Sequence, residues 1–452
     1  MANSTPQVSF TQALLFWLKL GFISFGGPAG QIAILQKELV DERRWISQAR
    51  FNHALNYCML LPGPEAQQLA TYIGWLMHRT PGALIAGGLF VLPSLFILIA
   101  LSWIYVAYGQ VPAVASVLWG VQCAVAAIVL HALHRVATRT MPDFKKNPQV
   151  AVVLIALSAM SFIAIAFFNI SFLWIVLISA IVGWLAAKRY PEQFKGGGHG
   201  AAAKGGDANY LIGDDTPTPS HATYSKAKML RMLLIGLALW AASFAALVAW
   251  QGWDSSLTQM GWFFSKAAMV TFGGAYAVLP YVTQTAVANQ WLTPDQMMAG
   301  LALGETTPGP LIMIVAFVGY VGQALEVQRA SHSHIVEISM LIMGSLGAIV
   351  ATWFTFLPSF VFILAGGPFI ESTHGKLGFT APLKAISAAV VGAIASLAVL
   401  FIQHTVIGKA GVDWAALALM LLAAFALFKL QWPLVRVIGL CAFLGLLRGW
   451  LL

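Results

Sequence analysis

The clearest chemical pattern in this sequence is a lysine placed seven residues before a pair of glycines, and it occurs twice. Lys19 precedes Gly26-Gly27, and Lys266 precedes Gly273-Gly274. Seven residues are close to two helical turns, so each ammonium group lies on the helical face that leads to its glycine pair. Glycine pairs allow positive φ and close backbone approach, as an anion-binding nest requires. The pattern predicts stabilisation of an anion, and its alternative is a lysine that reaches the membrane interface.

A second motif, Pro-Gly-Pro, follows each glycine pair as Pro62-Gly63-Pro64 and Pro308-Gly309-Pro310. Its first proline ends one helix, and its second proline suits the first turn of the next helix. The new N-terminus directs free N–H groups and the positive end of the helix dipole at a ligand. We therefore expect a side chain at Gly63 or Gly309 to intrude on a bound anion. The alternative is that these motifs only kink helices or pack them tightly.

Two carboxylates lie near the motifs. Glu65 directly follows Pro64, and Glu305 precedes Pro308 by three residues. A carboxylate beside an anion path repels the anion unless it is protonated, so both are candidates for proton coupling. Glu65 alternatively favours a helix N-terminus. The following side chains are candidate neutral donors along the path or, alternatively, satisfied contacts between helices: Asn52, Asn56, Tyr72 and Thr306.

The composition places these motifs in a lipid bilayer. Hydrophobic residues make up 59% of the 452 residues and charged residues only 9%, and the mean hydropathy is +0.79. This chain has too little polar surface for a soluble globule, and its apolar runs have the length of helical spans. We therefore predict an all-α polytopic membrane protein. The clearest predicted spans are 150–168, 171–187, 229–250, 341–364, 412–428 and 432–452.

The recurring motifs divide the chain into two homologous helical repeats. We expect a first transmembrane repeat at 10–190, a flexible aqueous linker at 191–228, an extra helix at 229–250 and a second repeat at 258–452. The linker is rich in Gly, Ala, Pro, Thr and Ser and has no apolar period. An extra span between duplicated units inverts the second unit when each unit crosses the membrane an even number of times.

The basic residues of the first repeat predict its topology. By the positive-inside rule they all lie on the cytoplasmic side. All of the basic residues lie on that side if the Gly-Gly and Pro-Gly-Pro segments enter the membrane and return to the side from which they came. The first repeat then has four true spans, and the chain has a cytoplasmic N-terminus and an external C-terminus. Counting each broken segment as a full span also inverts the repeats, but places residues 135–146 opposite Arg43. The basic residues are Lys37, Arg43, Arg44, Arg50, Arg79, Arg135, Arg139, Lys145, Lys146, Lys188 and Arg189.

Several motifs in a fixed order carry a resemblance to a known family. In the first repeat they are Phe25-Gly26-Gly27-Pro28, Arg43-Arg44-Trp45, Leu61-Pro62-Gly63-Pro64, Tyr72-Ile73-Gly74, Gly82-Ala83 and Leu92-Pro93-Ser94. In the second they are Phe272-Gly273-Gly274, Leu279-Pro280, Trp291, Pro308-Gly309-Pro310, Gly319-Tyr320 and Phe356-Leu357-Pro358-Ser359. Over residues 10–140 and 260–405 the chain resembles the chromate ion transporter family in its long two-domain form.

The resemblance implies export of chromate across the inner membrane, and thereby chromate resistance, by a multi-pass protein. We expect as partners a chromate or sulfate-like dianion and the lipid bilayer, with no organic cofactor; a homodimer stays open. A sulfate or other oxyanion carrier and a passive anion channel are the alternatives. The basic residues form no stripe with interleaved aromatics, so nucleic acid is not expected. An intramembrane enzyme is disfavoured because the motifs of metalloproteases and serine hydrolases are absent. Three well-separated cysteines, Cys58, Cys123 and Cys441, have no metal-ligand spacing.

Overall fold

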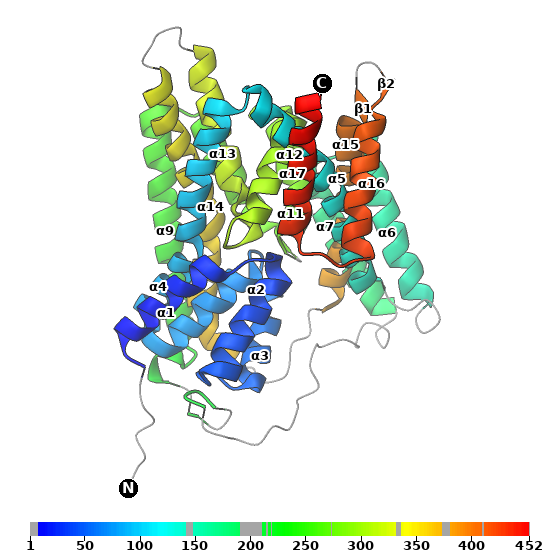
Figure 1. The fold of residues 1–452 in the computed structure, drawn as a ribbon. Coiled ribbons are helices and arrows are strands. Elements are labelled where there is room, and N and C mark those ends of the chain that lie inside the picture. Colours follow the sequence, from blue (N-terminus) through cyan, green and yellow to red (C-terminus); the bar gives the residue numbers. More distant parts are fainter. Residues whose placement is uncertain are drawn as a thin grey trace.

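A computed structural model shows a bundle of helices that run mostly along one direction (Figure 1). It describes residues 8–141, 148–189, 210–213, 216–217, 219–272, 274–330, 336–372, 380–408 and 411–451. The elements of the first repeat are α1 Phe10–Ile23, α2 Gly27–Gln36, the π-helix Lys37–Glu42, α3 Gln48–Cys58, α4 Glu65–Tyr108, α5 Pro112–Thr140, α6 Pro148–Ala166 and α7 Phe172–Arg189.

The second part of the chain follows a short 3₁₀ turn at Ser220–Ala222 and the extra helix α9 Lys226–Gln251. Its helices are α10 Ser256–Met269, α11 Ala275–Ala288, α12 Pro294–Thr306, a 3₁₀ turn Leu311–Met313, α13 Ile314–Ala330, α14 Val336–Ser372, α15 Thr380–Val406, α16 Trp414–Phe428 and α17 Leu434–Leu451. The strands β1 Ile407–Gly408 and β2 Gly411–Val412 form a small antiparallel hairpin before α16.

Nine helical segments in the described part of the chain are long and apolar enough to cross a membrane. Four of them, α4 to α7, belong to the first repeat. Five of the six spans that we predicted from apolar runs coincide with long helices within a few residues, and α14 extends beyond its predicted span. The sixth, at 412–428, is the shorter helix α16. The prediction of an all-α polytopic membrane protein is confirmed.

The helix α4 folds back on itself near its start. His78 and Arg79 leave helical geometry, and Arg79 has φ 56° and ψ −152°. A Cβ atom on Gly74 would lie 2.4 Å from the carbonyl oxygen of Gly82, whereas eight residues of straight helix span about 12 Å. Residues 65–77 therefore pack against the beginning of the long segment that ends at Tyr108. The chain turns back toward the end from which it came.

The second repeat has the same close crossing between α13 and α14. A Cβ atom on Gly319 would lie 2.2 Å from the Gly347 carbonyl oxygen, and one on Gly347 would lie 2.1 Å from that of Gly319. Small residues at such crossings let two helical backbones touch, which is the usual way that membrane helices gain packing contacts. These glycines therefore serve close packing of paired helices in both repeats.

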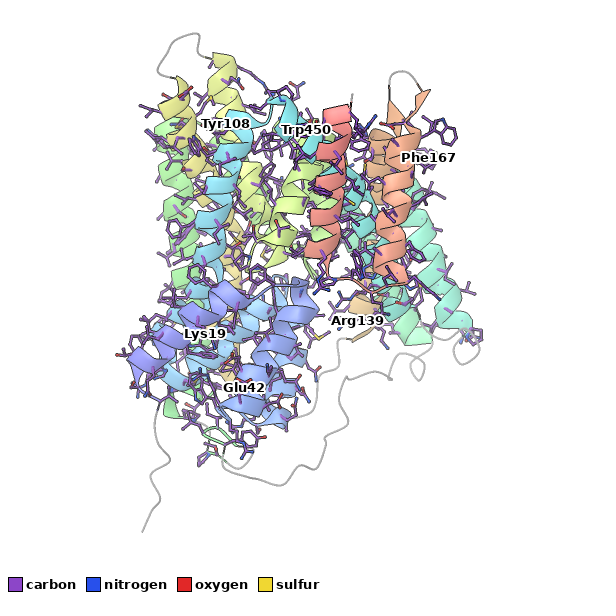
Figure 2. All side chains as sticks on the ribbon, in the orientation of Figure 1. Lys19, Glu42, Tyr108, Arg139, Phe167 and Trp450 are labelled. Carbon is purple, nitrogen blue, oxygen red and sulfur yellow. The ribbon has the colours of Figure 1, made fainter. Side chains whose placement is uncertain are left out.

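The labelled side chains show which loops share an end of the bundle. Lys19, Glu42 and Arg139 lie at its lower end in Figure 2, and Tyr108, Phe167 and Trp450 lie toward its upper end. Arg139 thus shares an end with the Glu42 turn, next to Arg43. We call this lower end, which carries Lys19, Glu42 and Arg139, the basic end.

Part of the predicted linker packs against the first repeat. Ile212 forms a parallel bridge with Ile46, and the backbone N–H of Leu211 donates to the Arg44 carbonyl at 3.0 Å. Ile212 and Ala222 are buried. Residues 190–209, 214–215 and 218 lie outside the described residues, so the prediction of a flexible linker there stays a prediction.

Candidate functional site

The glycine pairs and the Pro-Gly-Pro motifs interrupt helices in both repeats. α1 ends at Ile23 before Gly26 and Gly27, which have φ values of 94° and 69°. In the second repeat α10 ends at Met269, and Gly274 has φ 95°. Gly273 lies outside the described residues. The positive φ angles that the sequence pattern suggested are thus present at the described glycines of these pairs.

The two Pro-Gly-Pro motifs begin their next helices differently. α4 starts directly after Pro64, at Glu65, as expected. After Pro310 the chain first forms the 3₁₀ turn, and α13 begins only at Ile314. The central glycines Gly63 and Gly309 have φ values of 125° and 104°, which L side chains rarely adopt.

The interruptions of the two repeats meet each other through matching hydrogen bonds. The Gly63 N–H donates to the Thr271 carbonyl, and the Gly309 N–H donates to the Ser24 carbonyl, both at 2.8 Å. Thr271 and Ser24 each lie two residues before a glycine pair. Each Pro-Gly-Pro motif is therefore bonded to the glycine-pair break of the other repeat. The Gln31 side chain adds a hydrogen bond to the Gly309 carbonyl.

A serine of the other repeat lies next to each central glycine, and Gln68 also lies next to Gly63. A Cβ atom on Gly63 would lie 2.4 Å from Ser359 Oγ, and one on Gly309 would lie 2.8 Å from Ser94 Cβ. The sequence led us to expect that such a methyl group would intrude on a bound anion. In the structure such a methyl group meets a serine of the Leu-Pro-Ser motif in the other repeat, so these glycines have a packing role between the repeats. Their place at a bound anion stays a prediction.

The two candidate lysines lie in different surroundings. Lys19 Nζ forms an ion pair with Glu38 Oε1 at 3.2 Å, and its side chain is 56% exposed. Lys266 Nζ lies 5.5 Å from the centroid of the Trp262 ring, and the residue is partly buried. The two lysines therefore have different partners, and their joint role at an anion stays a prediction.

A cavity of about 310 Å³ lies beside the breaks of the first repeat. That volume equals about ten molecules of liquid water. Its walls come from the start of α2, one face of α3, the first residue of α4 and the last turn of α5. The lining residues are Pro28, Ala29, Ile32, Asn52, Leu55, Asn56, Met59, Glu65 and Arg139.

The polar groups of this cavity suit a small anion. The Arg139 guanidinium offers positive charge and several N–H donors, and Asn52 and Asn56 lie one turn apart on α3. Asn52 Oδ1 accepts from Gln48 Nε2 at 2.9 Å, a bond that uses none of the Asn52 N–H donors. The first turn of α2, which is the positive end of its dipole, forms part of the wall through Pro28 and Ala29.

The two carboxylates occupy related but distinct places. Glu65 lines the cavity with Arg139 and is 7% exposed. Glu305 is 4% exposed; its Oε1 accepts a hydrogen bond from the Tyr276 hydroxyl, and its Oε2 has no hydrogen-bond partner among the described residues. The Arg135 guanidinium acts on Glu305 electrostatically. Arg135 and Arg139 lie one turn apart on α5. Arg139 therefore interacts with Glu65, and Arg135 interacts with Glu305.

Arg139 and Tyr276 were missed as site residues in the sequence. Arg139 belonged to a group of basic residues that the positive-inside rule fully explains. Its spacing of four residues from Arg135 places both on one helical face, which was the available signal. Among the candidate neutral donors, the Tyr72 hydroxyl donates to Glu371, and the Thr306 hydroxyl donates to the Ala302 carbonyl at 3.1 Å.

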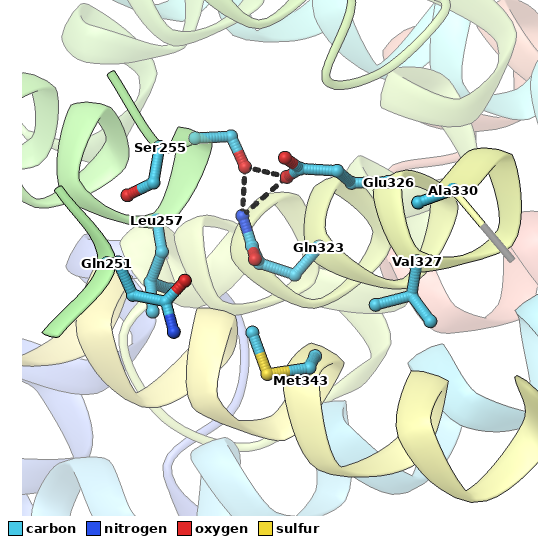
Figure 3. A pocket seen from close by; sticks show the side chains of 9 residues that line it. Gln251, Ser255, Leu257, Gln323, Glu326, Val327, Ala330 and Met343 are labelled. Carbon is cyan, nitrogen blue, oxygen red and sulfur yellow. Dashed lines mark hydrogen bonds between the residues drawn. The ribbon is translucent and has the colours of Figure 1, made fainter. Parts of the chain in front are cut away.

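A second cavity, of about 200 Å³, lies where α9, α10 and α13 meet (Figure 3). Gln323 Nε2 donates to Glu326 Oε2 at 3.3 Å, and the Ser256 hydroxyl bonds to both side chains. Among the described residues that line it, only Glu326 is charged. A carboxylate without a cation repels a dianion, so the cavity beside Arg139 is the better candidate.

Comparisons with known proteins agree with the motifs. The chain matches the family described as Chromate transporter over residues 11–184 and 258–446. It is 27% identical to the "Chromate transport protein" of Cupriavidus metallidurans, over 98% of this chain and 95% of that protein. It is 31% identical to the "Chromate transport protein" of Pseudomonas aeruginosa, over 88% and 83% of the two chains. A "Probable chromate transport protein" of Synechococcus elongatus is 27% identical over 87% and 85%. No solved structure matches the chain.

The family match covers both repeats and contains the glycine-pair and Pro-Gly-Pro breaks at which the repeats meet. The long apolar helices make the chain a multi-pass membrane protein. The chain belongs to the chromate transporter family, in its long two-domain form.

Proposed function

We propose that this protein is a secondary transporter that exports chromate across the inner membrane and thereby confers chromate resistance. The observation that carries the proposal is the cavity in which Arg139, Asn52 and Asn56 face the start of α2. Family membership and the names of the relatives support chromate as the substrate. The basic end of the bundle is cytoplasmic in this proposal, so the cavity receives chromate from the cytoplasm.

The cavity supplies what a dianion needs when it leaves water. Chromate loses part of its hydration shell in a low-dielectric site, at a cost that only positive charge and convergent donors offset. The Arg139 guanidinium and the two amide groups provide such donors, and the α2 dipole adds to them. Glu65 opposes a bound dianion while it is ionised. Anion binding therefore favours protonation of Glu65, which links transport to the proton gradient.

Glu305 is the second candidate for proton coupling. It lies at the end of α12, directly before the second Pro-Gly-Pro motif, and Tyr276 donates to one of its oxygens. An ionised carboxylate buried with one unpartnered oxygen is unfavourable, so this side chain gains from taking up a proton. Its place on the breaks of the second repeat makes it sensitive to any movement of those breaks.

We also propose that the two repeats are inverted relative to each other in the membrane. The matching hydrogen bonds of Gly63 and Gly309 support this arrangement, because each repeat contributes the same donor and the same acceptor. The close crossings at Gly74 and Gly319 support re-entrant segments that return to their own side. Inverted repeats with broken helices at a central site are typical of alternating-access transporters.

Uptake of chromate into everted membrane vesicles tests the proposal. A carrier exporter accumulates chromate in everted vesicles when a proton gradient is applied, and an excess of sulfate leaves the rate high if chromate is preferred. Equilibration that ignores the gradient indicates a channel, and strong inhibition by sulfate indicates a general oxyanion carrier. Absence of chromate uptake above vesicles without the protein contradicts the proposal.

Arg139→Gln tests the site itself. The change removes the positive charge from the cavity and leaves a shorter polar side chain. Hydrogen bonds to a charged group contribute about 1.5–3 kcal/mol, so the affinity for chromate is expected to fall by roughly 10- to 100-fold. Arg436→Gln, on α17 and outside the cavity lining, is the control. If Arg139→Gln and the control transport chromate equally at matched protein level, the cavity beside Arg139 is not the chromate site.

A further inference from the structure

The helix α3 has two opposite faces with different partners. Asn52, Leu55, Asn56 and Met59 line the cavity. Arg50, His53 and Tyr57 face the end of α14, which belongs to the other repeat. With 100° per residue, these two sets point in nearly opposite directions around the helix. The helix α3 therefore lies between the cavity and α14.

The contact with α14 is polar and buried. Arg50 Nη1 lies 3.9 Å from Glu371 Oε2, and the side chains of these two residues are 8% and 3% exposed. The Tyr72 hydroxyl donates to the other oxygen of Glu371. The His53 ring nitrogen Nε2 lies 3.1 Å from the Ile370 carbonyl oxygen. Residues of α3 and α4 in the first repeat thus hold the last turn of α14.

The Arg50 guanidinium is incompletely satisfied. Its Nη2 donates to the Thr216 carbonyl at 2.6 Å, but Nε and Nη1 have no hydrogen-bond partner among the described residues, and neither does Glu371 Oε2. The 3.9 Å between Nη1 and Oε2 is too long for a hydrogen bond. Charges that are buried without full pairing make a contact that forms and releases more readily than a packed apolar one.

The two positions of the second repeat that match Arg50 and Tyr72 carry uncharged residues, Gln296 and Phe317. Phe317 precedes Gly319 by two residues, as Tyr72 precedes Gly74. Phe317 packs edge-on against Tyr105 near the end of α4, with ring centroids 5.3 Å apart. Trp291 and Gln296 occupy the positions that correspond to Trp45 and Arg50. An ion pair at one end and an aromatic contact at the other make the two ends of the protein different.

We propose that Arg50 and Glu371 are positioning residues for transport that hold α3 against α14, with Glu371 itself held by Tyr72 of α4, and that this contact keeps the cavity open between α3 and Arg139. When this contact releases, α3 is free to move across the cavity toward α5. The inference rests on the proposed function, since it takes the cavity as the anion site. It assigns control of access at the basic end to a contact between the repeats.

The accessibility of the cavity tests this inference without any substrate. Asn56→Cys places a thiol in the cavity wall of a chain whose buried Cys58, Cys123 and Cys441 are changed to Ala. A membrane-impermeant maleimide, added to everted vesicles, reports how often the cavity is open. Tyr72→Phe and Glu371→Gln are each expected to slow labelling about tenfold, the equivalent of one hydrogen bond to a charged group. Arg448→Gln, which breaks the Arg448–Asp413 pair elsewhere, is expected to leave labelling unchanged.

Chromate kinetics provide a second readout. A smaller fraction of open cavity raises KM for chromate by the same factor, because apparent affinity falls with the population of the binding-competent state. A merely structural loss lowers the amount of folded protein and Vmax instead. If Glu371→Gln does not fold, Tyr72→Phe alone tests the inference. This variant is expected to fold, because Phe is the residue at the matching position of the second repeat.

Labelling of Tyr72→Phe within about twofold of the parent chain overturns the inference, since a lost hydrogen bond to a charged group predicts a larger change. Failure of the unmodified chain to transport chromate contradicts the proposed function instead, and the labelling experiment still reports on the contact. The two failures are therefore distinguishable.

Discussion

At the scale of single residues, Gly63 combines a backbone angle and a contact that no other residue type satisfies. Gly63→Ala adds a methyl group at φ 125°, 2.4 Å from Ser359 Oγ. We expect a loss of about 2–5 kcal/mol of stability from backbone strain and overpacking, measured as a lower melting temperature in detergent. Adding Ser359→Gly recovers only part of the packing loss, because Gln68 Nε2 also lies 2.6 Å from the new Cβ atom. Gly88→Ala, where nothing lies within 4 Å of the new Cβ, is the control; equal losses at both glycines contradict the argument.

Lys19 acts at longer range than Gly63. Its ammonium is exposed and paired with Glu38 at the basic end, so we expect it to act on chromate by electrostatic steering. Lys19→Gln is expected to raise KM about two- to threefold at low ionic strength and to leave Vmax unchanged. The difference disappears near 1 M salt, where the Debye length is about 3 Å. A loss of Vmax that persists at high salt assigns Lys19 to the binding site itself.

At the scale of elements, the reversal in α4 rests on a strained residue. Arg79 has φ 56° and ψ −152°, a region that costs non-glycine residues about 1–3 kcal/mol. Arg79→Gly is expected to relieve this strain and raise the melting temperature. The net gain is about 1 kcal/mol, because glycine loses more chain entropy on folding and this offsets part of the relieved strain. Arg79→Ala removes the side chain but keeps the strain. Equal melting temperatures for the Gly and Ala variants mean that the turn is unstrained.

At the scale of the whole molecule, the distribution of charge predicts its orientation. Single cysteines at Glu42 and Arg139 are expected to react with impermeant reagent from the cytoplasm, and cysteines at Tyr108 and Trp450 from outside. The first two lie at the basic end in Figure 2, and the last two lie toward the other end. The three native cysteines, which are buried, are changed to Ala in these variants. Labelling of Glu42→Cys and Arg139→Cys from opposite sides contradicts the re-entrant, inverted arrangement.

The membrane class, the helical spans and the places where helices break follow from the sequence because they depend on local properties. Apolar runs of sufficient length form spanning helices in any context, and Gly-Gly and Pro-Gly-Pro interrupt a helix through their own backbone restrictions. The positive φ of Gly26 and Gly27 and the start of α4 at Glu65 are of this kind. The duplication is also visible directly as repeated letters.

The tertiary structure decides which of these breaks meet and which side chains line the cavity. Gly63 bonds to Thr271, and Arg50 faces Glu371, across hundreds of residues of chain, so no local pattern specifies either contact. Arg139 looks like an ordinary topological charge until α5 places it beside Glu65. The physical reason is that residue type sets what a side chain is able to do, whereas the packing of distant helices sets what lies within its reach.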